Sequence, residues 1–312
     1  MMNIIVNVNR ALITSTVLAI SFILLLGPAS MTMNAFATTN TANQGIGQSQ
    51  ASTQLGICVS GDGTLFSCNN LNAQGQTNTG NNALAQQGGD DDDDDNGNTA
   101  NQGIGQSQTS NQNALCVSGT GTFVSCNNLN AQNQANSGNN ALAQQGGGSV
   151  GGNQATQSIG QSQTSNQNSG VASGGDTTGS GNNQNTQSQT NTGNNAAAQS
   201  GGSGSGGGNQ ATQSIGQSQT SNQNSGVASG GDTTGSGNNQ NTQSQTNTGN
   251  NAAAQSGGSG SGGGNQATQS IGQSQTSNQN SGVASGGNTA GSGNNVNTQT
   301  QNNTGNNAAA QQ

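Results

Sequence analysis

The sequence is poor in the side chains that build an ordinary protein interior. Of its 312 residues, 25% are hydrophobic and 1% are aromatic, and there is no Trp or Tyr. We therefore expect no conventional apolar core. Low hydrophobicity is also typical of disordered chains, but those usually carry high net charge and proline, whereas this chain has one Pro and 3% charged residues. A largely disordered chain remains the alternative to an ordered fold.

Positive charge is almost absent. Arg10 is the only basic residue, and the formal net charge is −8. Proteins that bind nucleic acid through its phosphates need Lys or Arg, so we expect no nucleic-acid partner. The same absence argues against binding to anionic membranes.

The residues of catalysis are missing as well. The chain has no His, Glu or Lys, and we expect its four cysteines to be oxidised. The usual general bases and activated nucleophiles are therefore absent, and we expect no enzymatic activity, no catalytic residues and no cofactor-binding residues. No G-K-[ST] sequence follows the glycine-rich segments, so they are not phosphate-binding loops.

Residues 1–37 differ from the rest of the chain. Arg10 precedes an apolar run from Ala11 to Leu26, and Ala35-Phe36-Ala37 follows. A positive charge, an apolar segment and an A-x-A site predict a signal peptide, with cleavage after Ala37. An uncleaved membrane anchor is the alternative, although the run is shorter than the ~20 residues that a span prefers. Either reading places the repeats outside the cell, secreted or at its surface, and we expect no other membrane contact.

Most of the chain consists of a polar sequence that is repeated five times. The phrase I-G-Q-S-Q recurs at Ile46, Ile104, Ile159, Ile215 and Ile271, with spacings of 58, 55, 56 and 56 residues. Spacing this regular indicates a repeat architecture. The predicted organisation is a signal peptide (1–37), repeat 1 (38–89), an acidic linker (90–97), repeat 2 (98–148), repeat 3 (149–208), repeat 4 (209–264) and repeat 5 (265–312).

Each repeat contains two polar arms that alternate as β-strands do. Gln161, Gln189 and Gln217 stand at matching points 28 residues apart. In one arm Gln106 and Gln108 share a face, and the small residues between them share the other. Polar tracts of this kind can stack their amides between strands. We predict an all-β fold, either a β-solenoid or a stack of β-hairpins, with flexible glycine-rich linkers at 146–152, 201–208 and 257–264.

Four cysteines lie in the first two repeats. Cys58 and Cys68 are separated by nine residues, as are Cys116 and Cys126, and each pair flanks a Gly-rich turn. In an exported chain this spacing favours the disulfides Cys58–Cys68 and Cys116–Cys126. A zinc site is the weaker alternative, because the four thiols are split between two repeats and no His accompanies them.

The acidic linker contains D-x-D-x-N-G, with Asp92, Asp94 and Asn96 as candidate calcium ligands. The pattern resembles the first half of an EF-hand loop, but Gly103 stands where that loop needs a bidentate Glu. We therefore expect a solvated linker, with loose calcium binding as the alternative and no other cofactor.

The second arm contains the pattern Q-x4-N-x-A-x3-Q in three repeats, at Gln76, Asn81, Ala83 and Gln87, at Gln134, Asn139, Ala141 and Gln145, and at Gln301, Asn306, Ala308 and Gln312. This pattern resembles the curlin repeat of bacterial curli fibres. Repeats 3 and 4 depart from it, with Ser200 and Ser256 in the last position. The resemblance implies a β-solenoid in which these residues form ladders, and which polymerises into an extracellular amyloid.

Three functions follow from these observations. The first is a secreted structural protein that associates with itself to form or coat extracellular fibres of a biofilm or cell-surface matrix. The second is an adhesion module that binds ice or surface glycans through flat arrays of Thr, Asn, Gln and Ser. The third is a disordered, hydrated surface coat.

Overall fold

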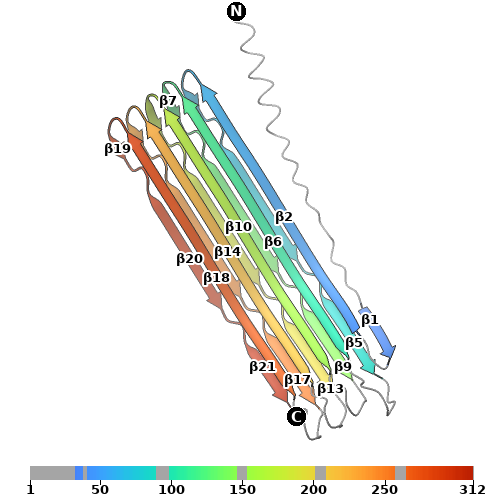
Figure 1. Cartoon of the computed structure of the whole chain (residues 1–312). Coiled ribbons are helices and arrows are strands. Elements are labelled where there is room, and N and C mark those ends of the chain that lie inside the picture. Colours follow the sequence, from blue (N-terminus) through green and yellow to red (C-terminus); the bar gives the residue numbers. More distant parts are fainter. Residues whose placement is uncertain are drawn as a thin grey trace, which may run out of the picture.

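The computed structural model describes residues 32–37, 41–88, 98–145, 153–200, 209–256 and 265–311. These residues form strands and turns, arranged as five similar coils that lie side by side (Figure 1). Within them, no helix has the length and hydrophobicity needed to cross a membrane. The apolar run at 11–26, the acidic linker and the glycine-rich segments lie outside the described residues.

Four parallel sheets run through the coils, and each coil contributes one strand to each. The long-strand sheet consists of β2 (Thr41–Ser60), β6 (Thr99–Ser118), β10 (Gln154–Ser173), β14 (Gln210–Ser229) and β18 (Gln266–Ser285). The tip sheet consists of β3 (Thr64–Leu65), β7 (Gly121–Phe123), β11 (Asp176–Thr178), β15 (Thr233–Thr234) and β19 (Thr289–Ala290).

The chain then returns along the opposite face in two strands. The return sheet consists of β4 (Asn70–Asn78), β8 (Asn128–Asn136), β12 (Asn183–Asn191), β16 (Asn239–Asn247) and β20 (Asn295–Asn303). The closing sheet consists of β1 (Thr32–Ala37), β5 (Asn82–Gly88), β9 (Asn140–Gln145), β13 (Asn195–Ser200), β17 (Asn251–Ser256) and β21 (Asn307–Gln311).

The fold is a β-solenoid, as predicted. All strand pairs are parallel and join neighbouring coils, in a register that places Ile159 beside Ile104 and Ile215. The offsets between coils are 58, 55, 56 and 56 residues, which are the spacings read from the sequence. The hairpin alternative is wrong, because the two arms of one coil belong to different sheets and face each other across the interior.

The predicted alternation of the arms is confirmed. Gln106 and Gln108 are buried, and the alternating residues Ser107 and Thr109 lie toward the outside. The alternation continues through the bend between the return and closing strands. There Gly138 packs so closely on the coil before it that an added Cβ would lie 2.1 Å from the carbonyl oxygen of Gly80, so no larger residue fits.

Apolar residues inside the coils are few and form three separate columns. One column is a stack of isoleucines: Ile46, Ile104, Ile159, Ile215 and Ile271. Another combines the cysteines with Val171, Val227 and Val283, and the third consists of Ala and Leu residues from the long and closing strands. The rest of the interior is polar, as expected from a sequence with too few hydrophobic residues for a conventional apolar core.

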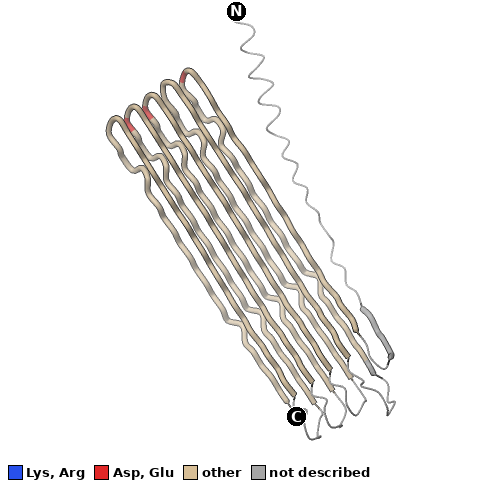
Figure 2. The backbone as a smooth tube through the Cα atoms, in the orientation of Figure 1, with Lys and Arg blue, Asp and Glu red and all other residues tan. Residues whose placement is uncertain are grey.

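Among the described residues, charge is confined to the tips. Figure 2 shows acidic residues at this end of the coils, and they are Asp62, Asp176 and Asp232. No Lys or Arg occurs in the described ranges, and no salt bridge therefore contributes to the stack there. Electrostatic attraction between charged side chains does not hold these coils together.

The strand β1 belongs to the predicted signal peptide, yet it pairs with β5 at the edge of the closing sheet. Ala35 lies beside Gln86, and Ala37 lies beside Gly88. Cleavage after Ala37 would therefore remove the whole of β1 and leave β5 as the edge strand.

Candidate functional site

The interior of the solenoid is held by columns of glutamine side chains. In the long-strand sheet, the Nε2 of Gln163 donates to Gln108 Oε1 at 3.0 Å in the preceding coil and to the Ser188 carbonyl across the interior at 3.0 Å. Its Oε1 accepts from Gln219 of the next coil at 2.9 Å. The side chain is fully buried, and it uses both its N–H groups and its oxygen.

The return strands carry glutamine columns of the same kind, but their cross-core contacts reach the following coil. Gln134 donates to Gln76 Oε1 in the preceding coil at 3.1 Å and to the carbonyl of Ser162 in the next coil at 3.0 Å. Each return strand therefore lies between two long strands, its own and that of the next coil. This stagger interlocks adjacent coils.

Asparagine columns run in the opposite direction. Asn130 Nδ2 donates forward to Asn185 Oδ1 at 2.8 Å and to Ser165 Oγ at 2.8 Å. Asn185 repeats both contacts toward the next coil. Glutamines thus donate toward the N-terminal end of the stack, and these inward asparagines donate toward its C-terminal end.

These columns explain how so polar a chain can hold a buried interior. Leaving a buried amide unpaired costs about 1–3 kcal/mol, whereas a satisfied one adds a modest net stabilisation. The side chains can be satisfied only when like residues lie in register, because each needs a partner in the coil above and another in the coil below. Register therefore takes the place of hydrophobic burial here.

The C-terminal end of the stack is an open edge. All nine residues of β20 are exposed. Gln273 and Gln275 donate backward and across the core, but no donor among the described residues reaches their Oε1 atoms. Asn297 and Asn303 accept from the preceding coil, and their own N–H groups have no acceptor within the described ranges.

At the N-terminal end of the stack, the complementary hydrogen-bonding groups lack partners. Gln48, Gln50 and Gln54 each use Nε2 once, across the core, so that one N–H of each has no acceptor in the part of the chain that is described. Asn72 donates forward, and its Oδ1 accepts nothing from the described residues. Donors at one end therefore match acceptors at the other.

The columns also match from end to end in residue type. The register passes through the five coils from Gln50 to Gln275 and from Asn72 to Asn297 without a change of residue. A C-terminal coil placed against an N-terminal coil of a second copy would therefore repeat the internal contacts. Such a head-to-tail contact is heterologous and does not close on itself.

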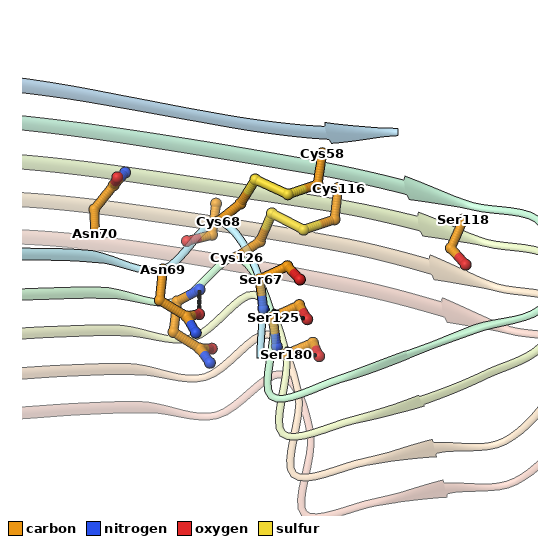
Figure 3. Close-up of a disulfide and its surroundings, with 12 residues drawn as sticks. Cys58, Ser67, Cys68, Asn69, Asn70, Cys116, Ser118, Ser125, Cys126 and Ser180 are labelled. Carbon is orange, nitrogen blue, oxygen red and sulfur yellow. Dashed lines mark hydrogen bonds between the residues drawn. A yellow bond between two sulfur atoms is a disulfide. The ribbon is translucent and has the colours of Figure 1, made fainter. Parts of the chain in front are cut away.

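Both predicted disulfides are present. They join Cys58 to Cys68 and Cys116 to Cys126, each with a Cα–Cα distance of 6.0 Å, and Figure 3 shows them stacked one beside the other. Each bridge crosses the interior from the long strand to the bend before the return strand. Beside them, a column of serines links the coils through backbone N–H groups, as from Ser67 to Ser125 Oγ at 3.2 Å (Figure 3).

In the later coils a Val–Gly pair replaces each disulfide. Val171 lies in register with Cys116, and Gly181 occupies the place of Cys126. Both Cys126 and Gly181 adopt a left-handed backbone, with φ of 57° and 70°. A Cβ on Gly181 would lie 3.0 Å from Val171 Cγ2, so the valine fills the space that the second cysteine occupies in the first two coils.

This replacement predicts that a third disulfide can be introduced in the last coil. We expect the paired substitution Val283→Cys and Gly293→Cys to form a bridge, because the Cβ at position 293 meets only Val283 atoms and the valine is removed. A bridge over so short a segment stabilises by about 2–3 kcal/mol. Mass spectrometry detects the bond, and denaturation with and without reductant measures the gain.

Gly293→Cys alone is the control for this bridge. It keeps Val283 Cγ2 at 3.2 Å from the new Cβ and forces a side chain onto a backbone with φ of 73°, so it should lower stability. If the double variant kept two free thiols under oxidising conditions, the equivalence of the Val–Gly and Cys–Cys pairs would be wrong.

The ladder residues suggested by the curlin motif divide between the two faces. Gln134 and Gln76 form a buried ladder rung, and Gln301 continues that column. Asn81 and Asn139 lie outside and belong to a second ladder, in which Asn139 Nδ2 donates to Asn81 Oδ1 at 3.2 Å and Asn194 Nδ2 donates to Asn139 Oδ1 at 3.1 Å. Asn306 also lies outside, and its backbone N–H donates to Asn250 Oδ1. Ala83, Ala141 and Gln145 are exposed, and Ala308 is in register with the outward Ala252. Gln87 pairs through its backbone with Gln145, and Gln312 lies outside the described residues.

The Gln and Asn ladders predicted from the motif are therefore present, but they lie on two different faces of the coils. Asn139 is five positions after Gln134, and an odd offset puts two residues of an alternating strand on opposite faces. The inward residues of this segment are Asn136, Asn140, Leu142 and Gln144. Their signal in the sequence was the alternation itself, continued through the S-G-N bend.

The calcium candidates Asp92, Asp94 and Asn96 lie outside the described residues. Within the described ranges, no group of three or more His, Cys, Asp or Glu side chains is arranged to hold a metal ion. No family model matches the chain, and neither a curated protein nor a solved structure does.

Proposed function

We propose that the protein is the subunit of an extracellular fibre, which grows by stacking the C-terminal coil of one copy on the N-terminal coil of the next. The observation that carries the proposal is the complementarity of the two ends. At such a junction Gln301 would donate to the Ser49 carbonyl, as Gln245 donates to that of Ser274 inside the chain. Asn297 would reach Asn72 and Ser52 in the way that Asn241 reaches Asn297 and Ser277.

Further support comes from the composition of the stack. Among the described residues of the two coils that would meet, the only charged side chain is Asp62 at the tip, so no charge lies in the amide columns that would face each other. The two disulfides fit an oxidising compartment outside the cytosol. The resemblance to curlin repeats points to the same kind of assembly.

Electron microscopy and fibre diffraction of the chain from residue 38 test the proposal. We expect unbranched filaments one solenoid wide, with a meridional reflection near ~4.7 Å from strands perpendicular to the filament axis. A chain that stays monomeric at high concentration, with the strand content of the described coils intact, would remove the proposal.

An adhesive role is the second candidate. On the outer face of the long-strand sheet, a ladder of hydrogen-bonded amides runs along the stack. It consists of Asn111, Asn166, Asn222 and Asn278. A regular array of partly exposed amides is able to bind sugar hydroxyls or ice. Retention of single chains on an immobilised polysaccharide, lost when Asn222 is changed to Ala, would favour this role over a purely structural one.

A further inference from the structure

One of the four strand edges that must accept a second copy, the edge of the closing sheet, is already occupied by β1 in this chain. The strand β1 pairs with β5, with Thr32 beside Ala83, Ala35 beside Gln86 and Ala37 beside Gly88. No other N-terminal edge is covered in this way, since β2, β3 and β4 are the terminal strands of their sheets among the described residues.

The place of β1 is the place that the C-terminal strand of another copy would take. Inside the chain, β17 pairs with β21 so that Ala252 lies beside Ala308 and Gln255 beside Gln311. Continued across a junction, this register puts Ala308 beside Ala83 and Gln311 beside Gln86. Both strands would need the same backbone groups of β5, so they exclude each other.

From this coincidence we propose that β1 is an intramolecular cap, which blocks head-to-tail stacking until the segment up to Ala37 is removed. The inference rests on the proposed function. The predicted cleavage site follows the last residue of β1, so one cut would free the whole cap and keep β2 intact. Cleavage on export would then couple assembly to arrival outside the cell.

The connection between cap and solenoid makes the block effective. Only residues 38–40 separate β1 from β2, so the effective concentration of β1 at β5 is in the millimolar range, far above that of a micromolar partner. A docking copy could still approach β2 and β4. It would lose the whole closing-sheet contact, including the amide bonds that continue the Gln255–Gln311 column.

The experiment uses the full chain in mild detergent, with a specific protease recognition sequence in place of residues 38–40. Filament growth from preformed seeds is followed before and after cleavage. We expect cleavage to accelerate growth tenfold or more, on the order allowed by the ratio of effective to free concentration.

Two variants of β1 separate the cap from other effects of the N-terminal segment. Neighbouring residues of a strand point their N–H groups to opposite sides, so Asn34→Pro with Ala35→Pro removes one N–H on the side of β5. The uncut proline variant should grow as fast as the cut chain. Asn34→Thr with Ala35→Val keeps both N–H groups, and should stay blocked until it is cut.

Each outcome has a separate meaning. Equal growth before and after cleavage would overturn the cap and leave the proposed fibre standing. Slow growth of the uncut proline variant would also overturn it, because the block would then come from something other than β1 pairing. If no chain formed filaments even after cleavage, the proposed function and the cap that rests on it would both be wrong.

Discussion

The paired substitution Asn297→Asp and Asn303→Asp is expected to abolish filament growth and leave the single chain folded. In the chain, the Oδ1 atoms of both residues accept from Asn241 and Asn247, and an aspartate can accept equally well. At the proposed junction, the lost N–H groups would have faced the Oδ1 atoms of Asn72 and Asn78. The new carboxylates would face the same oxygens without a donor.

The expected effect is large, because a buried charge left without a partner costs about 3–5 kcal/mol. One such residue weakens the association of two copies roughly a hundredfold or more. Seeded growth of the chain from residue 38 is the measurement, with circular dichroism to show that the strands persist. Since Asp is protonated below about pH 4, growth should partly return in acid.

A variant with the same added charge provides the control. Thr298 and Asn302 lie on the same strand but alternate with Asn297 and Asn303, so they face outward. Thr298→Asp with Asn302→Asp should assemble far better than the inward pair. If the two variants were equally impaired, repulsion between charged chains rather than the amide junction would be the cause.

Gln163→Glu is expected to lower the free energy of unfolding by about 3–5 kcal/mol. The glutamate has no N–H for Gln108 Oε1 and the Ser188 carbonyl, and its charge would be fully buried between them. Chemical denaturation on the assembly-deficient Asn297→Asp/Asn303→Asp background measures the loss, so that association does not contribute to stability.

The pH dependence of this variant has a defined sign. Burial raises the pKa of the new carboxyl in the folded state above its value in the unfolded chain. The unfolded state then loses the proton first, so the penalty grows as the pH rises through the unfolded pKa. The stability deficit should therefore shrink in acid.

Gln184→Glu is the matched comparison, because Gln184 is exposed on the outside of β12. The same chemical change there should alter stability by less than about 0.5 kcal/mol. A similar loss at both positions would mean that buried amide columns do not hold the coils together.

Much of the architecture could be predicted from the sequence. The spacing of the isoleucines gave the offsets between coils, and the alternation of Gln106 and Gln108 with small residues gave the inward face. The cysteine spacing gave the disulfide partners. Each of these rests on chain geometry that is local or strictly periodic, namely the period of two in a strand and the repeat of one coil.

Other features could not be predicted, because they depend on which strands meet in space. The sequence could not show whether the two arms of a coil pair as a hairpin or face each other, since both arrangements use the same alternation. The curlin motif suggested Ala141 and Gln145 as ladder residues, but the strand alternation through Gly138 turns both outward.

The sequence by itself determined the period of the coils, the alternation of the strands and the identity of the stacked residues, because an exact repeat leaves each amide only a copy of itself to pair with. Tertiary structure alone decided the stagger of the return strands, the opposite directions of the Gln and Asn columns, and the pairing of β1 with β5. All three features depend on which strands lie next to each other and on the distance between facing strands, and both are set only when the coils stack.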